Sequence, residues 1–225
     1  MDWFPLFNSL RIALLSSALV TVLGIAAAYY LAKLPPVAKN AADLVLTLPL
    51  VLPPTAVGFL LLLFLGPHHL IGAAVLNAFG VKLTMQWWSA VFAVTAVVFP
   101  LMYRTARGAF EAFDQTLAYS AQSIGLSNTY IFWHIRMPCC RRDIMAGIAL
   151  TFARSLGEYG ATNMVAGYSR QGATIATEVY RLWNAGEEGA AMRWVLVSIA
   201  LAAAALIAVS RIGQRTGQKE RRGQL

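Results

Sequence analysis

Long apolar runs without a charged residue restrict this chain more than any other feature of its sequence. Residues 12–31, 44–65 and 83–103 contain no Asp, Glu, Lys or Arg. A helix of about 20 apolar residues is long enough to cross the hydrocarbon core of a bilayer. Charged residues make up only 12% of the chain, against about 25% in soluble domains. The sequence therefore predicts an all-α polytopic membrane protein with a single domain over residues 1–225.

Two further stretches complete a set of five predicted spans. Residues 144–165 are interrupted only by two charged residues, and residues 194–210 form the last apolar run. Residues 70–81 are shorter and are expected to form a surface or re-entrant segment, which leaves five or six membrane helices open. The first run, residues 12–31, exceeds the about 7–15 apolar residues of a signal peptide and is expected to be retained.

The distribution of basic residues predicts the orientation of these spans. With five spans and an external N-terminus, the inner loops and the C-terminal tail carry twelve Lys and Arg residues, and the outer segments carry five. Cytoplasmic loops are usually the more basic ones. The prediction is an inner (cytoplasmic) membrane protein with an external N-terminus, a cytoplasmic segment 104–142, an external segment 166–193 and a basic cytoplasmic tail 211–225.

Three prolines lie inside the second apolar run. Pro49, Pro53 and Pro54 each lack a backbone donor and clash with the carbonyl four residues earlier, which kinks or breaks a helix. A carbonyl freed in this way needs a partner, so a break at membrane depth should face protein or a water-filled cavity. A packing kink is one interpretation; three prolines so close together favour a break that lines a pathway.

Arg154 and Glu158 place charge where the fourth run should cross the bilayer. Four residues apart, they would lie on one face of a helix and could neutralise each other, and Gly157 and Gly160 would allow close approach of another helix. A charge near the bilayer centre costs at least about 2.5 kcal/mol, so the pair should face protein or water. Two interpretations stay open. The pair could fix the packing of helices, or it could lie near the gate of a pathway, where Arg154 attracts a transported anion and Glu158 keeps Arg154 from holding that anion tightly.

Residues 117–138 predict two short helices along the inner face of the membrane. Ser127, Asn128 and Thr129 are turn and N-cap residues ahead of the second helix, expected over Tyr130–Ile135, and Gly125 permits the backbone angles of a turn. The aromatic residues of this loop would either anchor it in the membrane interface or form a knob that docks a soluble partner: Tyr130, Phe132 and Trp133.

Several kinds of site are missing from the sequence. It has no G-x4-GK[ST] phosphate loop and no triad-like order of Ser, His and acid, so ATP hydrolysis would need a separate subunit. His68 and His69 are predicted to lie across the membrane from His134, which leaves no metal site. Cys139 and Cys140 are adjacent and are expected to be small residues at a helix start. We therefore expect neither an enzyme nor a cofactor. Nucleic-acid binding is not expected either, because the basic tail lacks the interleaved aromatic residues that single-strand binding uses.

Residues 117–138 resemble the conserved cytoplasmic loop of ABC-importer permeases, which has the form EAA-x3-G-x9-I-x-LP. Four residues fall in register with this pattern: Ala121, Gly125, Ile135 and Pro138. Tyr119 and Ser120 replace the usual Glu-Ala, and Met137 replaces the usual Leu. In that family the loop forms coupling helices that dock in a groove of the ATPase subunit, so the resemblance implies that these four residues couple the chain to an ATPase.

Residues 48–62, 99–111 and 152–162 narrow the resemblance to molybdate-type permeases, close kin of the sulfate and thiosulfate permeases. It implies the type I ABC-importer permease (MetI-like) fold and ATP-driven import of a tetrahedral oxyanion, most directly molybdate. Sulfate, thiosulfate or tungstate remain alternatives, and a passive anion channel is a less favoured one.

The resemblance also implies the partners. They are a second permease copy in a homodimer, a cytoplasmic ATPase dimer and an external molybdate-binding protein, in addition to membrane lipid. Residues 184–193 are expected to be a solvated external loop on the face where the binding protein would dock. No regulatory domain follows residue 225, so feedback inhibition is not expected.

Overall fold

The computed structural model describes residues 2–167 and 172–222, with side chains up to residue 207, and every regular element in this part is helical. The elements follow in order: α1 (Phe4–Leu31), α2 (Pro36–Val51), α3 (Pro54–Leu65), α4 (Leu70–Phe79), α5 (Trp87–Ala112), α6 (Gln115–Ser123), α7 (Asn128–Ile131), a π-helical turn η1 (Phe132–Arg136), α8 (Met137–Cys139), α9 (Arg141–Leu156), α10 (Gly160–Ala166), α11 (Ile175–Asn184) and α12 (Glu188–Arg222).

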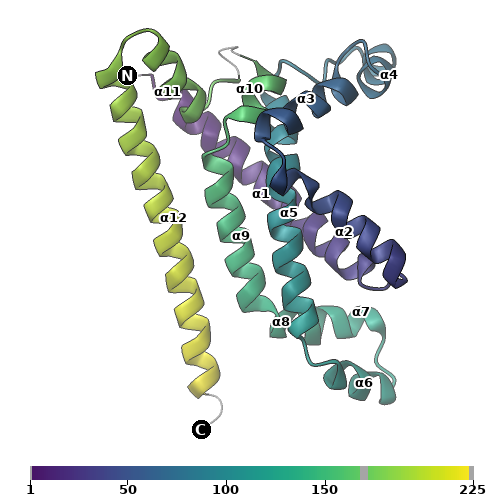
Figure 1. Ribbon diagram of the computed structural model, residues 1–225. Coiled ribbons are helices and arrows are strands. Elements are labelled where there is room, and N and C mark those ends of the chain that lie inside the picture. Colours follow the sequence, from purple (N-terminus) through teal and green to yellow (C-terminus); the bar gives the residue numbers. More distant parts are fainter. Residues whose placement is uncertain (1, 168–171, 223–225) are drawn as a thin grey trace.

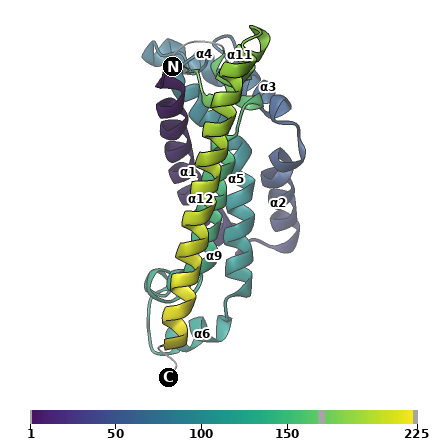
Figure 2. The same cartoon turned by 90° about the vertical axis from the view of Figure 1, so that its left-hand side faces the viewer.

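The long helices run between two ends of the molecule (Figure 1). The N-terminus, α4, α10 and α11 lie at one end, called the α11 end below. Helices α6 to α8 and the C-terminal end of α12 lie at the other, called the α6 end. A view at 90° shows the same elongated arrangement (Figure 2). The termini thus lie at opposite ends of the helices.

Helix α5 is central and packs against α1 along much of its length. Small residues allow this contact: Ala13 and Ala106 are fully buried, and a Cβ on Gly24 would lie 3.0 Å from Met102 Cγ. Helices in lipid associate through close backbone approach of this kind, because apolar burial gives no advantage over lipid tails. The helix differs from the apolar run 83–103. It begins four residues later, behind a capping box of Gln86 and Ser89, and continues to Ala112.

The second apolar run is broken, as its prolines predict. α2 and α3 meet at an angle of 117°. Leu52 has the extended backbone typical of a residue before proline (ψ 144°). Pro54 occupies the first turn of α3, where a missing N–H costs nothing. Pro49 lies inside α2 without ending it, so two of the three prolines make the break.

The predicted span 144–165 is not one helix. α9 ends at Leu156, and α10 begins at Gly160. With 16 residues α9 is about 24 Å long, less than the ~30 Å of a hydrocarbon core. Glu158 lies between the two helices, one residue before Tyr159, the N-cap of α10. Its carboxylate accepts a hydrogen bond from the backbone N–H of Ala161, which has no partner within the first turn of α10. A charged residue that looks like a mid-helix interruption in the sequence thus lies at the start of a new helix.

Within the described residues, three helices are long and apolar enough to cross a bilayer alone: α1, α5 and the Glu188–Ile207 part of α12. The bent pair α2–α3 would be a fourth crossing. The predicted count of five spans therefore also needs α9 and α10 to cross together. The apolar helix α4 has only ten residues and lies at the α11 end, where a surface segment was expected.

The last helix starts earlier and extends further than its apolar run. α12 begins at Glu188, so the second half of the predicted loop 184–193 is helical. Trp194 is buried there against Ile175 and Leu182 of α11, which explains the early start. The helix continues to Arg222, so most of the predicted tail 211–225 is helical and its last three residues lie outside the described part.

Candidate functional site

The two helix breaks lie side by side because α3 packs against α10. A Cβ on Gly160 would lie 3.2 Å from the Cβ of Pro54, and a Cβ on Gly58 would lie 2.9 Å from the Cα of Ala161. A larger side chain at either glycine would push the two helices apart. Gly157 differs, because among the described residues, its own neighbours in the chain apart, no atom lies within 4 Å of where a Cβ would be. The close approach predicted for both glycines is therefore found within the chain at Gly160 alone.

Arg154 and Glu158 form an ion pair at this junction. Arg154 Nη1 lies 3.0 Å from Glu158 Oε2, while Glu158 Oε1 accepts the N–H of Ala161 at 3.0 Å. The pairing agrees with the sequence prediction, but the two residues do not share one continuous helix, since Arg154 is in the last turn of α9 and Glu158 lies beyond its C-cap. Each carboxylate oxygen thus has a donor.

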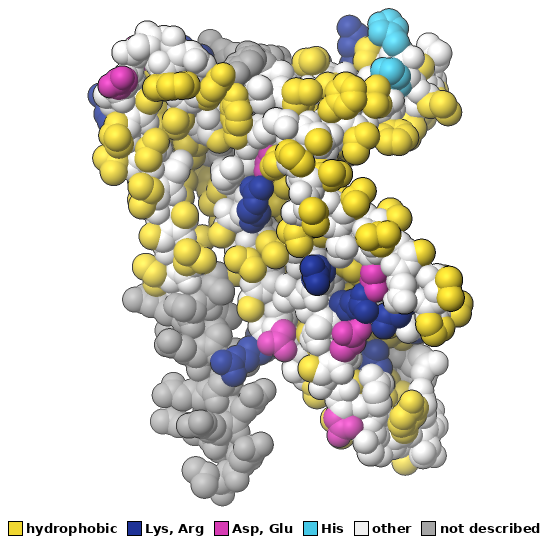
Figure 3. Space-filling model, viewed as in Figure 1, with side chains coloured by type: hydrophobic (Ala, Val, Ile, Leu, Met, Phe, Trp, Pro, Cys, Tyr) yellow, Lys and Arg dark blue, Asp and Glu magenta, His cyan; other side chains and the backbone are white. Residues whose placement is uncertain are grey.

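The two partners differ strongly in exposure. The Glu158 side chain is 1% exposed and the Arg154 side chain 42%. Arg154 lies 13 residues into α9, about 20 Å from its start. Figure 3 shows one basic group beside an acidic one over the upper part of α9, in a recess between α9 and the α2–α3 arm. An arginine at such depth is not stable against lipid, so this recess must face protein or water.

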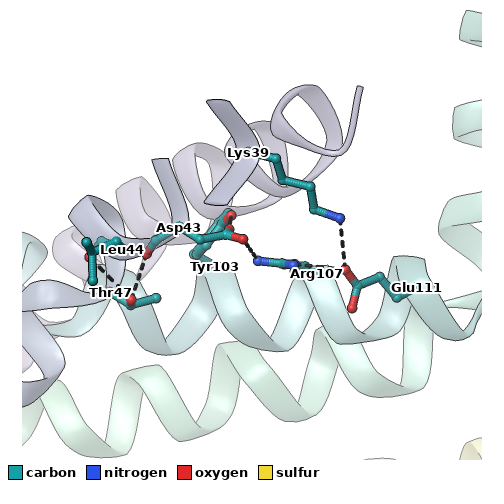
Figure 4. Close-up of polar contacts among 7 residues, drawn as sticks. All are labelled: Lys39, Asp43, Leu44, Thr47, Tyr103, Arg107 and Glu111. Atoms are coloured by element: carbon teal, nitrogen blue, oxygen red, sulfur yellow. Dashed lines mark hydrogen bonds and ion pairs between the residues drawn. The ribbon is translucent and has the colours of Figure 1, made fainter. Parts of the chain in front are cut away.

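A polar network between α2 and α5 was not predicted from the sequence (Figure 4). Asp43 accepts a hydrogen bond from the Tyr103 hydroxyl and forms an ion pair with Arg107. Arg107 Nε also donates to Glu111 Oε1 at 2.8 Å, and Lys39 Nζ lies 3.3 Å from the same oxygen. α2 has no buried residue, so these polar contacts are a main part of its attachment to α5.

Replacing Asp43 with alanine is expected to lower the free energy of unfolding by about 1–3 kcal/mol. The substitution removes the acceptor of the Tyr103 hydroxyl and one of the two carboxylates paired with Arg107. A buried polar group left without a partner costs about 1–3 kcal/mol. Thermal unfolding of the detergent-purified protein would measure the effect. Lys39→Ala is the control, since it removes only a half-exposed pair worth at most about 1 kcal/mol. Equal effects of the two substitutions would contradict the role given to Asp43.

The predicted pair of short helices is found at the α6 end. α6 is followed by a turn in which Gly125 has φ +85°, a left-handed angle that favours glycine. Of the three candidate cap residues, Ser127 caps α7, because its side chain accepts the N–H of Tyr130, and the helix begins at Asn128, two residues earlier than expected. α7 then continues through η1 into α8, which contains Pro138. The first part of the expected segment 104–142 belongs to α5, so the loop itself starts at Phe113.

Aromatic contacts fix this pair of helices to the bundle. The Phe132 ring centroid lies 4.5 Å from that of Tyr29 in α1 and 6.1 Å from that of Phe110 in α5. The Arg136 guanidinium lies 5.1 Å from the centre of the Phe113 ring. Phe132 therefore packs inward. This disagrees with both predicted roles for Phe132, an anchor in the membrane interface and part of a docking knob. Ala121 is 5% exposed and belongs to the buried core of the bundle.

The same helices also carry exposed apolar side chains. Ile124 is 77% exposed, Tyr119 63% and Trp133 60%. Tyr130 is also exposed and stacks on His134, with ring centroids 4.1 Å apart. We call the surface made by Tyr119, Ile124, Tyr130 and Trp133 the outer coupling face.

The adjacent cysteines have different environments. Cys139 is exposed, whereas Cys140 is buried and its thiol donates to the Ala109 carbonyl at 3.2 Å. Burial raises the pKa of the Cys140 thiol to about 11. Since the thiolate is the reactive form, we expect N-ethylmaleimide at neutral pH to modify Cys139 alone. Peptide mass spectrometry would detect this, and labelling of both residues at equal rates would contradict the assigned burial.

The remaining candidates do not assemble into a further site. His68 and His69 lie before α4 at the α11 end, and His134 lies in η1 at the α6 end. Among the described residues, no three His, Cys, Asp or Glu side chains are grouped closely enough to hold a metal ion.

Comparison with known proteins adds to this geometry. Residues 21–219 match the model of a family described as binding-protein-dependent transport system inner membrane component. The chain is 37% identical over 209 residues to the molybdenum transport system permease protein ModB of Escherichia coli (strain K12), covering 92% of this chain and 91% of that protein. It is 34% identical to ModB of Haemophilus influenzae, covering 94% and 93%.

Solved structures show the same fold at low sequence identity. A chain of a bacterial alginate ABC transporter, in complex with an alginate-bound periplasmic protein, superposes with a TM-score of 0.74 at 18% identity and covers 93% of this chain and 77% of its own. A chain of an inward-facing MetNI methionine ABC transporter gives a TM-score of 0.72 at 13% identity, with coverage of 96% and 99%.

Proposed function

The chain belongs to the family of binding-protein-dependent transport system inner membrane components, and from this premise we propose that it is the permease subunit of an ATP-driven molybdate importer. Its fold is that of a type I ABC-importer permease. The observation that carries the substrate is the similarity to molybdenum transport permeases over more than nine tenths of the chain. Tungstate and sulfate have the same tetrahedral dianionic form and are the alternatives to test.

Two copies of the chain would form the pathway. The support is the partly exposed Arg154, which needs protein or water beside it at membrane depth. A second copy placed against the same face would enclose a water-filled passage between the two recesses, with Arg154 from each copy lining it. The broken segments at Pro53–Pro54 and Gly157–Gly160 would then border this passage. In irregular backbone of this kind, free carbonyl and N–H groups are tolerated only beside protein or water.

At this position Arg154 would attract the dianion, and Glu158 would limit how tightly it is held. A pore must bind its ion strongly enough to admit it and weakly enough to release it. The buried Glu158 also caps α10, so the ion pair is connected to the packing between α10 and α3. A shift of α3 against α10 would therefore change the position of the arginine.

The α6 end is proposed to be cytoplasmic. Six basic residues with described side chains lie in or next to this end: Lys33, Lys39, Arg107, Arg136, Arg141 and Arg142. Four lie toward the other end: Arg11, Lys82, Arg181 and Arg193. This asymmetry favours an external N-terminus and a cytoplasmic C-terminus, and the α11 end would meet an external binding protein.

The outer coupling face would dock a separate ATPase subunit. Exposed aromatic and aliphatic side chains are typical of interface anchors, and the inward contacts of Phe132 would carry movement of the docked helices to α1 and α5. Closure of an ATPase dimer would then switch the permease pair between inward and outward access. ATP can drive this change because it binds the two states with different affinity.

The test is transport by the assembled complex. The chain is co-purified with its ATPase subunit, reconstituted in proteoliposomes and supplied with a molybdate-binding protein. We expect uptake of radiolabelled molybdate that requires ATP inside the vesicles and binding protein outside, with competition by tungstate stronger than by sulfate. Uptake without ATP would indicate a passive anion channel, and preference for sulfate would reassign the substrate.

A further inference from the structure

The structure places a second arginine, Arg104, in the recess that contains Arg154. Arg104 lies in α5 and is exposed, although the helix around it packs at the centre of the molecule. We propose that Arg104 is a second oxyanion-binding position, at which the anion stops after it leaves Arg154 and before it is released at the α6 end. This inference rests on the proposed importer function and extends it by one site.

The direction of Arg104 follows from its neighbours on α5. Thr105 faces α9, since its Cγ2 would lie 2.8 Å from a Cβ on Gly147. Arg107 faces α2 through its ion pair with Asp43. With about 100° between successive helix residues, Arg104 lies about 100° from Thr105 on one side and about 60° from Arg107 on the other. Arg104 therefore points between α9 and α2.

The surroundings of Arg104 leave its charge available. Among the residues that the structure describes, no carboxylate lies within ion-pair distance of Arg104, whereas Arg107, one turn away, has two. Gly108 lies one turn nearer the α6 end and on the same face, and in the described part of the chain no atom outside its own helix backbone and chain neighbours lies within 4 Å of where a Cβ would be. The space in front of Arg104 is thus open toward the α6 end, and the cation there is uncompensated.

The spacing of the two arginines suits a passage with successive binding positions. The Gly147–Thr105 contact puts Arg104 at the level of Gly147 on α9. Arg154 lies seven residues further along α9, about 10 Å closer to the α11 end. A dianion held loosely at Arg154, whose charge Glu158 partly offsets, would move toward the uncompensated Arg104. Conduction through several weak sites is the usual way to combine selectivity with release.

The experiment measures transport stoichiometry in the reconstituted importer. We expect Arg104→Gln to reduce the molybdate transported per ATP hydrolysed about tenfold, the loss typical for one charged hydrogen-bonding group. The ATPase rate stimulated by the binding protein should stay within about twofold, because ATPase docking and helix movement do not involve Arg104. Arg104→Lys should keep at least about half of the transport. Unchanged stoichiometry in Arg104→Gln would overturn the proposal.

Two further variants keep the test independent of folding. Gly108→Phe leaves the charge in place and fills the space in front of it, so it should reduce transport about as much as Arg104→Gln. Lys82→Gln removes one exposed positive charge at the α11 end and should have no effect on stoichiometry. Transport as fast as wild type in Gly108→Phe would show that no anion passes in front of Arg104.

A phospholipid headgroup offers the same chemistry as a free oxyanion, so the assay is run in two lipids. In vesicles of phosphatidylcholine alone and in vesicles that also contain phosphatidylglycerol, the ratio of variant to wild-type transport should be equal. A loss confined to the anionic vesicles would assign Arg104 to a lipid phosphate and overturn the proposal. If Arg154→Ala reduces transport and Arg104→Gln does not, only the second position fails; if neither does, the proposed pathway fails as well.

Discussion

Changing Ile124 to aspartate is expected to detach the ATPase subunit from the permease. Ile124 is 77% exposed and lies at the turn between the two short helices, next to Gly125. An anchor residue of this kind contributes about 2–4 kcal/mol to an interface, and a charge in its place would also have to be desolvated. The dissociation constant of the complex should therefore rise roughly 30- to 1000-fold. Titration of the labelled ATPase into detergent-purified permease would measure it.

The fold of the permease itself should not change, because the Ile124 side chain contacts mainly solvent in the single chain. Ile124→Val is the conservative control and should bind within a few-fold of wild type. Ala185→Asp puts the same charge on an exposed turn between α11 and α12 at the opposite end and should bind normally. Full ATPase binding by Ile124→Asp, with a normal melting temperature, would place the docking surface elsewhere.

Sequence features with a local cause were predicted correctly. The break at Pro53–Pro54, the turn at Gly125 and the presence of a helix cap within residues 127–129 each depend on the local properties of one to three residues. Such properties are the same in any protein, so their consequences can be read without knowing which segments meet. The pairing of Arg154 with Glu158 also follows from spacing alone.

Features that depend on distant partners were not predicted. α5 extends nine residues beyond its apolar run because Arg107 and Glu111 are paired with Asp43 and Lys39 of α2, more than 60 positions earlier. Spacing showed that Arg154 and Glu158 would be close, but not that Glu158 would cap a separate helix. Phe132 looks like its aromatic neighbours in the sequence and is distinguished only by its contact with Tyr29. The adjacency of the two helix breaks likewise requires the packing of α3 on α10.

Replacing Arg154 with alanine is expected to reduce ATP-dependent molybdate uptake by about 10- to 100-fold. A hydrogen bond to a charged group contributes about 1.5–3 kcal/mol, and removal of Arg154 takes at least one from the passing anion. The substitution also leaves Glu158 as an unpaired buried carboxylate beside the pathway, which repels an anion. Initial uptake rates in proteoliposomes, compared with the ATPase rate of the same vesicles, give the effect. Uptake equal to wild type would leave the ion pair a packing role only.

The partner variant Glu158→Gln separates binding from packing, because its effect on the anion should have the opposite sign. The amide oxygen of glutamine can still accept the Ala161 N–H, so α10 keeps its cap. Arg154 would then carry an uncompensated charge and hold the dianion more tightly, which slows release. We expect a lower maximal uptake rate together with stronger retention of molybdate by the assembled complex after a wash, whereas Arg154→Ala should retain less than wild type. If both variants lost uptake together with thermal stability and neither changed retention, the pair would serve helix packing and the anion would pass elsewhere.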